Sequence, residues 1–425
     1  MTAPSNETNE EPSLTSWKTY AVGIQMLFVA FGALVLIPIL VGMHPSIALF
    51  TAGAGTLLFT FITRGQIPVF LASSFAFLAP MSISLEKYGY GATFCGMFSV
   101  GIVYAILAIA IAYFGPGFIK RILPPIVTGP VIMVIGLGLA PTAASMAVSS
   151  AGSSDFSGIA LIVSFSTAGT AIAMALNKNR TLNLLPILIA IIVGYLVSIP
   201  FGLVDFKPVI EAAPIQWPWT SASAAGTFEW MEFSLPAILL FIPVSIVPAV
   251  EHFGDILAVQ SVTKKDYLKE PGLHRTILGD GVATALAAAL GGPPNTTYSE
   301  VTGAIALTGA YSTRFMRIAA VTSIVLSFVG ILGAFLQTIP TPVMGGILIL
   351  VFGMIGSIGL KTMIAGKVDF EEPKNYIIFA VIMMIGVGQL TIELGDFIIS
   401  GVGLAAILGI LLNAVLPSKV SQSAA

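Results

Sequence analysis

Four carboxylates stand inside long apolar stretches of the sequence: Glu251, Asp255, Asp280 and Glu300. A charged side chain at membrane depth is costly and usually has a function. Carboxylates in such places can accept hydrogen bonds from the N–H groups of a ligand, and a carboxyl that holds a proton can release it. The four residues therefore predict recognition of a polar molecule combined with proton movement. The alternative for each of them is a structural hydrogen-bond network.

The spacing of these acids separates their roles. Glu251 and Asp255 are four residues apart and share one helix face. Two close carboxylates in a poorly solvated site do not readily both ionise, so we expect one of them to hold a proton at neutral pH. His252 is turned by about 100° around the helix, which favours a packed, hydrogen-bonded histidine over a ligand. Asp280 lies early in its segment, near the end predicted to be cytoplasmic, which favours a structural role.

Other kinds of chemistry find little support in the sequence. The three histidines are scattered and Cys95 is the single cysteine, whereas zinc sites need clustered ligands. We therefore expect no metal, no cofactor and no disulfide framework. The formal net charge of -2 argues against a nucleic-acid partner. No nucleophile–base pair is recognisable, so we expect no enzyme.

The elements that hold the four acids are predicted membrane helices. Hydrophobic residues make up 56% of the 425-residue chain and charged residues only 9%, against roughly 25% charged residues in soluble domains. A spanning helix needs about 20 mostly apolar residues. Fourteen segments qualify, near 19–43, 46–63, 67–85, 91–114, 123–147, 158–177, 181–204, 234–260, 276–291, 293–310, 316–337, 340–364, 374–393 and 397–417.

The basic residues give an orientation for these segments. Lys and Arg concentrate in cytoplasmic loops. With the N-terminus inside, only Lys87 and Lys207 of the 18 basic residues fall in outside loops. The sequence thus predicts a multi-pass protein with cytoplasmic tails at 1–16 and 419–425 and one long outside loop at 207–233.

The third and tenth segments are interrupted, and the chain repeats itself around them. They read IPVFLASSFAFLAP and PPNTTYSEVTGAIAL, and Ser73-Ser74-Phe75 corresponds to Thr296-Thr297-Tyr298. A second pair of similar stretches is ILPPIVTGPVIMVIG and TIPTPVMGGILILVFG. Seven segments per half place the second half upside down, and inverted repeats with paired broken helices are typical of secondary transporters.

The two breaks predict where a ligand binds. Backbone that leaves the helix at membrane depth must be buried in protein or line a wet cavity. Its free N–H groups and half-helix ends can then bind a polar molecule. We expect the hydroxyls of Ser73, Ser74, Thr296 and Thr297 to satisfy some of these backbone groups. Phe75 and Tyr298 flank the breaks, where a flat ring could stack on either of them; ordinary packing is the alternative.

Several stretches together resemble one family. PAVEHFGDILAV, KEPGLHRTILGDG, GGPPNTTYSE, TPVMGG and IPVFLASSFAF are similar to sequences of the nucleobase/ascorbate transporter family, and the similarity runs from Gln25 to the last segment. The resemblance implies an all-α membrane protein of fourteen segments in two inverted repeats, with short strands in the broken segments. It further implies a core domain (17–117 and 234–338), a gate domain (118–206 and 339–418) and a homodimer formed through the gate.

The resemblance also implies roles for individual residues. Glu251 and Glu300 match the family's two substrate-binding acids, and Ser299 stands where a backbone group contacts the base. Phe75 matches a residue that lines the pocket, and Ala33 matches a small residue near the substrate. Tyr298 is added as a candidate binding residue on its position at the break. Bacterial members of this type are similar in using proton symport across the plasma membrane, which implies Glu251, Asp255 and Glu300 as proton-coupling candidates.

Departures from the family pattern leave the substrate open. Glutamate at 300 favours uracil. Val301 replaces an asparagine, Gly309 an arginine, and Phe352 a tyrosine, while Met26 replaces the histidine of a Gln-His pair. Asp255 stands where purine-type members tend to have an acid. We therefore expect a proton-coupled uracil symporter, with a purine or xanthine carrier as the alternative. An anion transporter of the same fold is a remote third possibility.

Overall fold

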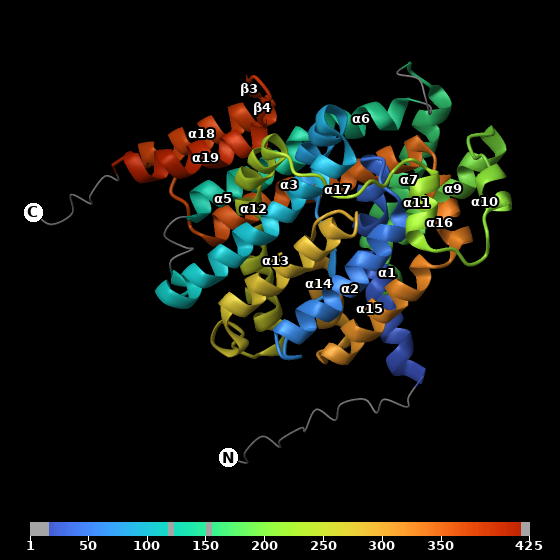
Figure 1. Ribbon diagram of the computed structural model, residues 1–425, viewed down its shortest axis with the longest axis horizontal. Coiled ribbons are helices and arrows are strands. Elements are labelled where there is room, and N and C mark those ends of the chain that lie inside the picture. The colour runs from blue at the N-terminus through green and yellow to red at the C-terminus, as the bar shows by residue number, and fades with distance from the viewer. Residues whose placement is uncertain (1–16, 118–122, 150–154, 418–425) are drawn as a thin grey trace, which may run out of the picture.

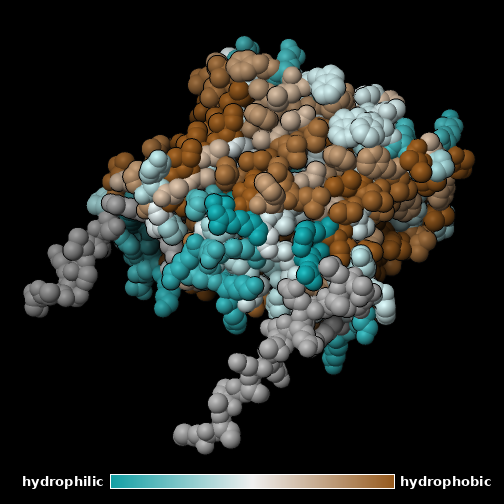
Figure 2. All heavy atoms as spheres, turned by 60° about the horizontal axis from the view of Figure 1, so that its bottom comes forward, coloured by the Kyte–Doolittle hydropathy of each residue, from teal (hydrophilic) through white to brown (hydrophobic). Residues whose placement is uncertain are grey.

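The computed structural model describes residues 17–117, 123–149 and 155–417, which leaves the two predicted tails outside the described residues. The described chain is mostly helical (Figure 1). Within it, seven helices are long and apolar enough to cross a membrane by length and composition. Figure 2 shows apolar side chains over most of one face and hydrophilic ones gathered along its lower edge, as expected of a surface that meets lipid and then water.

Six helices form a first packed group. α13 lies along α3 and α2, α15 lies along α1 and α2, and α12 lies along α3. Small residues allow this close packing: a Cβ added at Gly101 of α3 would lie 2.6 Å from the carbonyl oxygen of Gly281 in α13. The bounds are α1 (Trp17–Leu40), α2 (Pro45–Ile62), α3 (Leu78–Phe114), α12 (Leu235–Thr263), α13 (Leu273–Ala289) and α15 (Thr313–Ser327).

A second packed group is built around α17. α17 packs on α5, α6 and α7, while α18 packs on α19 and α5, and α7 packs on α9. α5 and α17 carry the two repeated proline-glycine stretches of the sequence. They meet at glycines, since a Cβ added at Gly129 would lie 2.8 Å from the carbonyl oxygen of Gly359. The bounds are α5 (Pro125–Gly138), α6 (Ala140–Val148), α7 (Gly158–Ala175), α9 (Pro186–Ser198), α17 (Thr341–Ala365), α18 (Pro373–Val387) and α19 (Gly401–Val415).

Short strands occupy both predicted breaks. β1 (Leu71–Ser73) and β2 (Asn295–Thr297) pair antiparallel, with Ala72 opposite Thr296. The 3₁₀ turn η1 (Phe75–Phe77) leads from β1 into α3, and α14 (Ser299–Thr308) follows β2. Two segments more than 200 residues apart in the sequence thus meet as one strand pair, and a helix starts beside each strand.

The backbone of the breaks is satisfied by neighbouring helices, which differs from the prediction. The Leu71 N–H donates to Thr56 Oγ1 at 2.9 Å, and Thr284 Oγ1 donates to the Asn295 carbonyl oxygen at 2.6 Å. Both threonines belong to helices of the first group. Thr297 directs its hydroxyl to a carboxylate instead. Ser73 Oγ has no hydrogen-bond partner among the described residues. Of the predicted hydroxyls, those of Ser73 and Thr297 therefore do not satisfy the backbone of the breaks.

One predicted segment has a different shape in the structure, whereas the third and fourth are separated as predicted. Both extend into α3, where non-helical backbone at Gly89 (φ 80°, ψ -178°) divides the element into two helices that meet at a kink. The eleventh, predicted at 316–337, is divided into α15 and α16 (Gly330–Gln337). Between them the backbone pairs with the loop at 207–233: the Gln216 N–H donates to the Phe328 carbonyl oxygen at 2.9 Å.

The remaining elements are short. The loop predicted at 207–233 contains α10 and α11, which lie beside α16 at one end of the molecule, while α18 and α19 lie at the other end (Figure 1). The bounds are α8 (Arg180–Asn183), η2 (Ile199–Phe201), α10 (Lys207–Glu211), α11 (Pro218–Ala224), η3 (Leu268–Gly272), β3 (Ile392–Leu394) and β4 (Phe397–Ile399).

Candidate binding site

A cleft, here called the central cleft, lies between the strand pair and the second helix group. Its volume is about 50 Å³. One wall comes from the two breaks and α12, and the other comes from α5 and α17. The lining residues are Ser74, Phe75, Ala76, Glu251, Thr296, Thr297, Tyr298 and Glu300 on the first wall, and Ile132, Ile135, Val351, Met354, Ile355 and Ile358 on the second.

Two of the four sequence-predicted acids line this cleft. Glu251 projects from α12 and is partly exposed, and Glu300 lies in the first turn of α14, with its side chain exposed. They come from segments that are separate in the sequence and meet only because β2 brings α14 against α12. The first wall therefore carries two carboxylates that can accept hydrogen bonds from a ligand.

Two helix starts face the same cleft. η1 begins at Phe75 and α14 begins at Ser299, and neither Ser74 nor Tyr298 caps its helix with a side chain. The first N–H groups of a helix have no partner within it, and the N-terminal end carries partial positive charge. The first wall thus combines N–H donors with the two carboxylate acceptors.

The other two acids lie behind the strand pair. Thr297 Oγ1 donates to Asp255 Oδ2 at 2.8 Å and stands 3.3 Å from His252 Nδ1. His252 Nδ1 lies 3.6 Å from Asp280 Oδ2. Asp255, Asp280 and His252 are all buried. They form a polar network that touches the central cleft through Thr297 and does not line it, and His252 is packed as the sequence predicts.

The aromatic candidates have different surroundings. The ring of Phe75 packs edge-on against that of Phe352 in α17, with centroids 5.8 Å apart and planes at 88°. This contact joins the two helix groups at the cleft. Tyr298 also lines the cleft. Ala33 is buried within α1 and is not among the described residues that line the cleft. Ser299 is the first residue of α14.

The aliphatic wall was missed by reasoning from the sequence. Ile132, Ile135, Val351 and Ile355 carry no chemical signature, and isoleucine and valine are common throughout the chain. Only their position could have indicated a role, since all four lie in or next to the two repeated stretches. A repeat that contains prolines and close-packed glycines marks helices that meet another backbone, but it does not say which of their side chains face a cavity.

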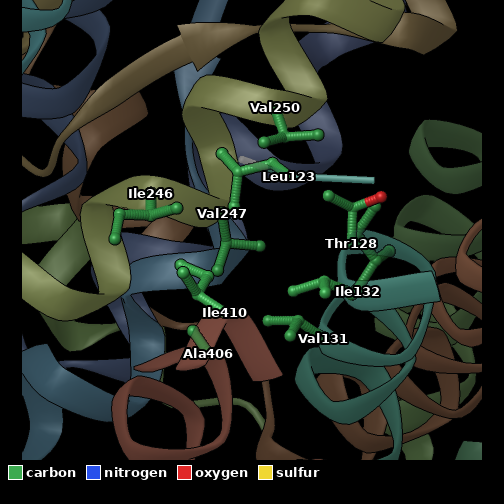
Figure 3. A pocket seen from close by; sticks show the side chains of 10 residues that line it. Leu123, Thr128, Val131, Ile132, Ile246, Val247, Val250, Ala406 and Ile410 are labelled. Atoms are coloured by element: carbon green, nitrogen blue, oxygen red, sulfur yellow. The ribbon is translucent and has the colours of Figure 1, made fainter. Parts of the chain in front are cut away.

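A narrow aliphatic pocket, here called the seam, lies between the two helix groups (Figure 3). Ile246, Val247 and Val250 of α12 face Val131 and Ile132 of α5, with side chains of α19 completing the seam. Its free space is only about 10 Å³, about the limit for one water. Apart from the Thr128 hydroxyl, the side chains lining the seam are aliphatic. Ile132 belongs to both the seam and the cleft.

Solved structures share this architecture. The transmembrane domain of a cyanobacterial bicarbonate transporter, BicA, superimposes with a TM-score of 0.68 at 13% identity, covering 94% of this chain and 97% of that one. The murine Slc26a9 anion transporter in its inward-facing state gives 0.67 at 11% identity, covering 93% and 67%. At such low identity the likeness concerns the fold alone.

The sequence relatives are much closer. A probable uracil permease of Pasteurella multocida is 47% identical over 96% of this chain and 97% of its own length. The uracil permeases of Bacillus caldolyticus and Escherichia coli K12 are 42% and 36% identical, covering 99% and 98% of this chain and 96% and 94% of their own lengths. The model of the "Permease family" matches residues 17–395. The chain therefore belongs to the Permease family and is a multi-pass membrane transporter rather than an enzyme.

Proposed function

We propose that this protein carries uracil across the plasma membrane together with a proton. The observation that carries the proposal is the first wall of the central cleft, where Glu251 and Glu300 stand beside two helix starts. Uracil offers two ring N–H donors and two carbonyl acceptors. The carboxylates accept from the N–H groups and the helix starts donate to the carbonyls. The relatives named uracil permeases support this choice of substrate.

The flat ring also fits the apolar parts of the cleft. Phe75 and Tyr298 offer ring surfaces on the first wall, and the second wall is aliphatic apart from the thioether of Met354. A site that pairs every polar edge of its substrate rejects analogues that leave those groups unpaired. A purine or xanthine carrier is the alternative, because Asp255 and Val301 depart from the family pattern on which the uracil assignment rests. An anion is disfavoured because no basic side chain is among the described residues of the cleft.

We further propose alternating access by a core domain (17–117 and 234–338) that moves against a gate domain (118–206 and 339–418). The two packed helix groups correspond to these ranges and support the division. The aliphatic seam supports relative motion, because sliding along it breaks few directional contacts. We also propose fourteen segments in inverted repeats, cytoplasmic termini and a homodimer formed through the gate domain. The crossing of α5 and α17 at glycines supports the repeat, because these helices carry the two similar stretches.

Uptake into proteoliposomes tests the function. Labelled uracil is offered with an imposed inward proton gradient, and then with the gradient collapsed by a protonophore. Xanthine, adenine and thymine serve as competitors. We expect gradient-driven accumulation that thymine reduces more than either purine does. Accumulation of labelled xanthine in place of uracil would move the substrate to the purine class, and uptake independent of the gradient would remove the proton coupling.

A further inference from the structure

A second pocket, here called the arginine pocket, lies at the end of the first helix group and shares no lining residue with the central cleft. It is open and broad, at about 770 Å³. Arg64, Arg275 and Arg317 reach it from the end of α2, the first turn of α13 and the second turn of α15. The rest of its lining is Leu57, Thr60, Phe61, Ile62 and Gly65.

The three arginines bring positive charge that no carboxylate in the pocket balances. None of the three guanidinium groups makes an ion pair within the part of the chain that the structure describes. No acid is among the described lining residues. Glu270, in the loop before α13, accepts from Gln66 Nε2 at 3.4 Å instead. Three unpaired arginines around a cavity match an anion with several acceptor oxygens, because guanidinium groups bind phosphate through paired N–H donors.

The helix ends strengthen the positive potential. α13 begins at Leu273, so Arg275 stands in its first turn, where a cation is unfavourable. Arg317 lies one turn further from its helix start, because α15 begins at Thr313. Thr313 Oγ1 donates to the Gly65 carbonyl oxygen at 3.0 Å, which holds the end of α2 beside the start of α15. Arg64 has φ 57°, a left-handed conformation that is uncommon for a residue with a side chain. An anion bound here would relieve the unfavourable placement of Arg275 and would be attracted by the charges of Arg64 and Arg317.

The apolar lining indicates what the anion is attached to. Phe61 is 82% exposed and is the next-to-last residue of α2, and Leu57 and Ile62 line the pocket with it. These side chains continue the apolar surface of a helix long enough to span a membrane. A free anion would gain nothing from them, whereas a lipid would place its acyl chains there. We propose that the arginine pocket binds the phosphate headgroup of an anionic phospholipid, with Phe61 contacting the acyl chain.

Lipid titrations of the purified protein test this proposal. Phosphatidylglycerol and phosphatidylcholine with the same acyl chains are added separately to protein in detergent, and lipid adducts are counted by native mass spectrometry. The variants are Arg275→Gln, Arg317→Gln and their combination. Lys361→Gln is the matched control, because Lys361 is an exposed cation on α17 outside the pocket. Arg275→Lys with Arg317→Lys preserves the charge and guards against loss of folding.

We expect one phosphatidylglycerol to bind preferentially, with affinity falling about fivefold for each arginine removed, since each basic residue near an anionic lipid contributes about 1 kcal/mol. The control and the lysine variant should keep most of this binding. Equal binding of both lipids, or unchanged phosphatidylglycerol binding in the double glutamine variant, would overturn the proposal. Inorganic phosphate that displaces the lipid at similar concentration would overturn the lipid as the source of the anion.

Discussion

Thr297 connects the central cleft to the buried acids at the scale of single residues. Its side chain lines the cleft, and its hydroxyl donates to Asp255 at 2.8 Å while standing 3.3 Å from His252. A change of charge at Asp255 therefore alters a group in the cleft wall. The acids that line the cleft and the buried acids are thus linked through one side chain, which would give the proposed proton binding a short route to the proposed substrate site.

Glu300 supports the first prediction. Replacing it with alanine removes a charged acceptor from the cleft wall, and hydrogen bonds to charged groups contribute roughly 1.5–3 kcal/mol. We expect uracil affinity to fall by at least about tenfold, measured by calorimetry or by competition for labelled uracil. Glu371→Ala, which removes an exposed acid between α17 and α18, is the control. Unchanged binding in the Glu300 variant would mean that the substrate lies elsewhere.

Asp255 supports a second prediction. Asparagine keeps an oxygen that can accept from Thr297 Oγ1 but cannot take up or release a proton. We expect Asp255→Asn to flatten the dependence of uracil uptake on pH between about 5 and 8, and to change uracil affinity much less. Uptake rates across that range measure the effect, with the exposed Asp369→Asn as control. A pH profile like that of the unchanged protein would exclude Asp255 from coupling.

Secondary-structure elements place the site through close backbone contacts. α5 and α17 both supply the aliphatic wall, and their spacing is set by glycines. A Cβ added at Gly136 would collide with the carbonyl oxygen of Phe352 and lie 2.8 Å from the Gly356 nitrogen. The wall therefore depends on glycines, which let α5 and α17 approach closely, as much as on the isoleucines that face the cleft.

The third prediction compares two glycine-to-alanine changes. Gly136→Ala in α5 introduces the collision described above, while Gly353→Ala in α17 meets open space. Both changes gain the same helix propensity, so the difference isolates the clash. We expect Gly136→Ala to be destabilised by about 1–3 kcal/mol relative to Gly353→Ala, seen as a lower melting temperature in detergent. Equal melting temperatures would show that the helices separate at little cost.

The two helix groups also touch at a polar contact away from the cleft, and this concerns the whole molecule. Beside the bend in α3, Lys87 Nζ lies 2.9 Å from Glu393 Oε1, and the Tyr88 hydroxyl donates to the Asp396 carbonyl oxygen at 2.6 Å. The acids belong to the β3–β4 hairpin between α18 and α19. These contacts fasten the first group to the second on the side predicted to face outward.

The fourth prediction concerns this fastening. Glu393→Gln with Tyr88→Phe removes both contacts, which should favour a conformation in which the cleft opens outward. A cysteine placed at Ile355, after Cys95→Ala removes the single native cysteine, reports opening by its labelling rate from outside. We expect faster labelling, by a modest factor because exposed ion pairs are weak. Glu371→Gln is the control, and unchanged labelling would show that these contacts do not hold the outside closed.

The sequence by itself determined that the chain belongs in lipid, where two of its segments are interrupted, and which acids lie in apolar stretches. Apolar length and rare charges are local properties of a sequence. The membrane-spanning segments, the interruptions at Ser73 and Thr296, and the acids Glu251 and Glu300 inside apolar stretches could therefore be identified without coordinates. The mostly helical membrane character followed, and the strands appeared at the predicted breaks. The family relationship came from the same local stretches.

Only the tertiary structure decided how those residues are arranged. It separated Glu251 and Glu300, which line the cleft, from Asp255 and Asp280, which lie behind β2. It also supplied the wall formed by residues such as Ile132 and Ile355. The physical reason is that a carboxylate in an apolar segment is costly wherever it points, whereas an isoleucine there costs nothing. Its role depends on which distant helix packs against it, and glycine contacts between α5 and α17 set that packing.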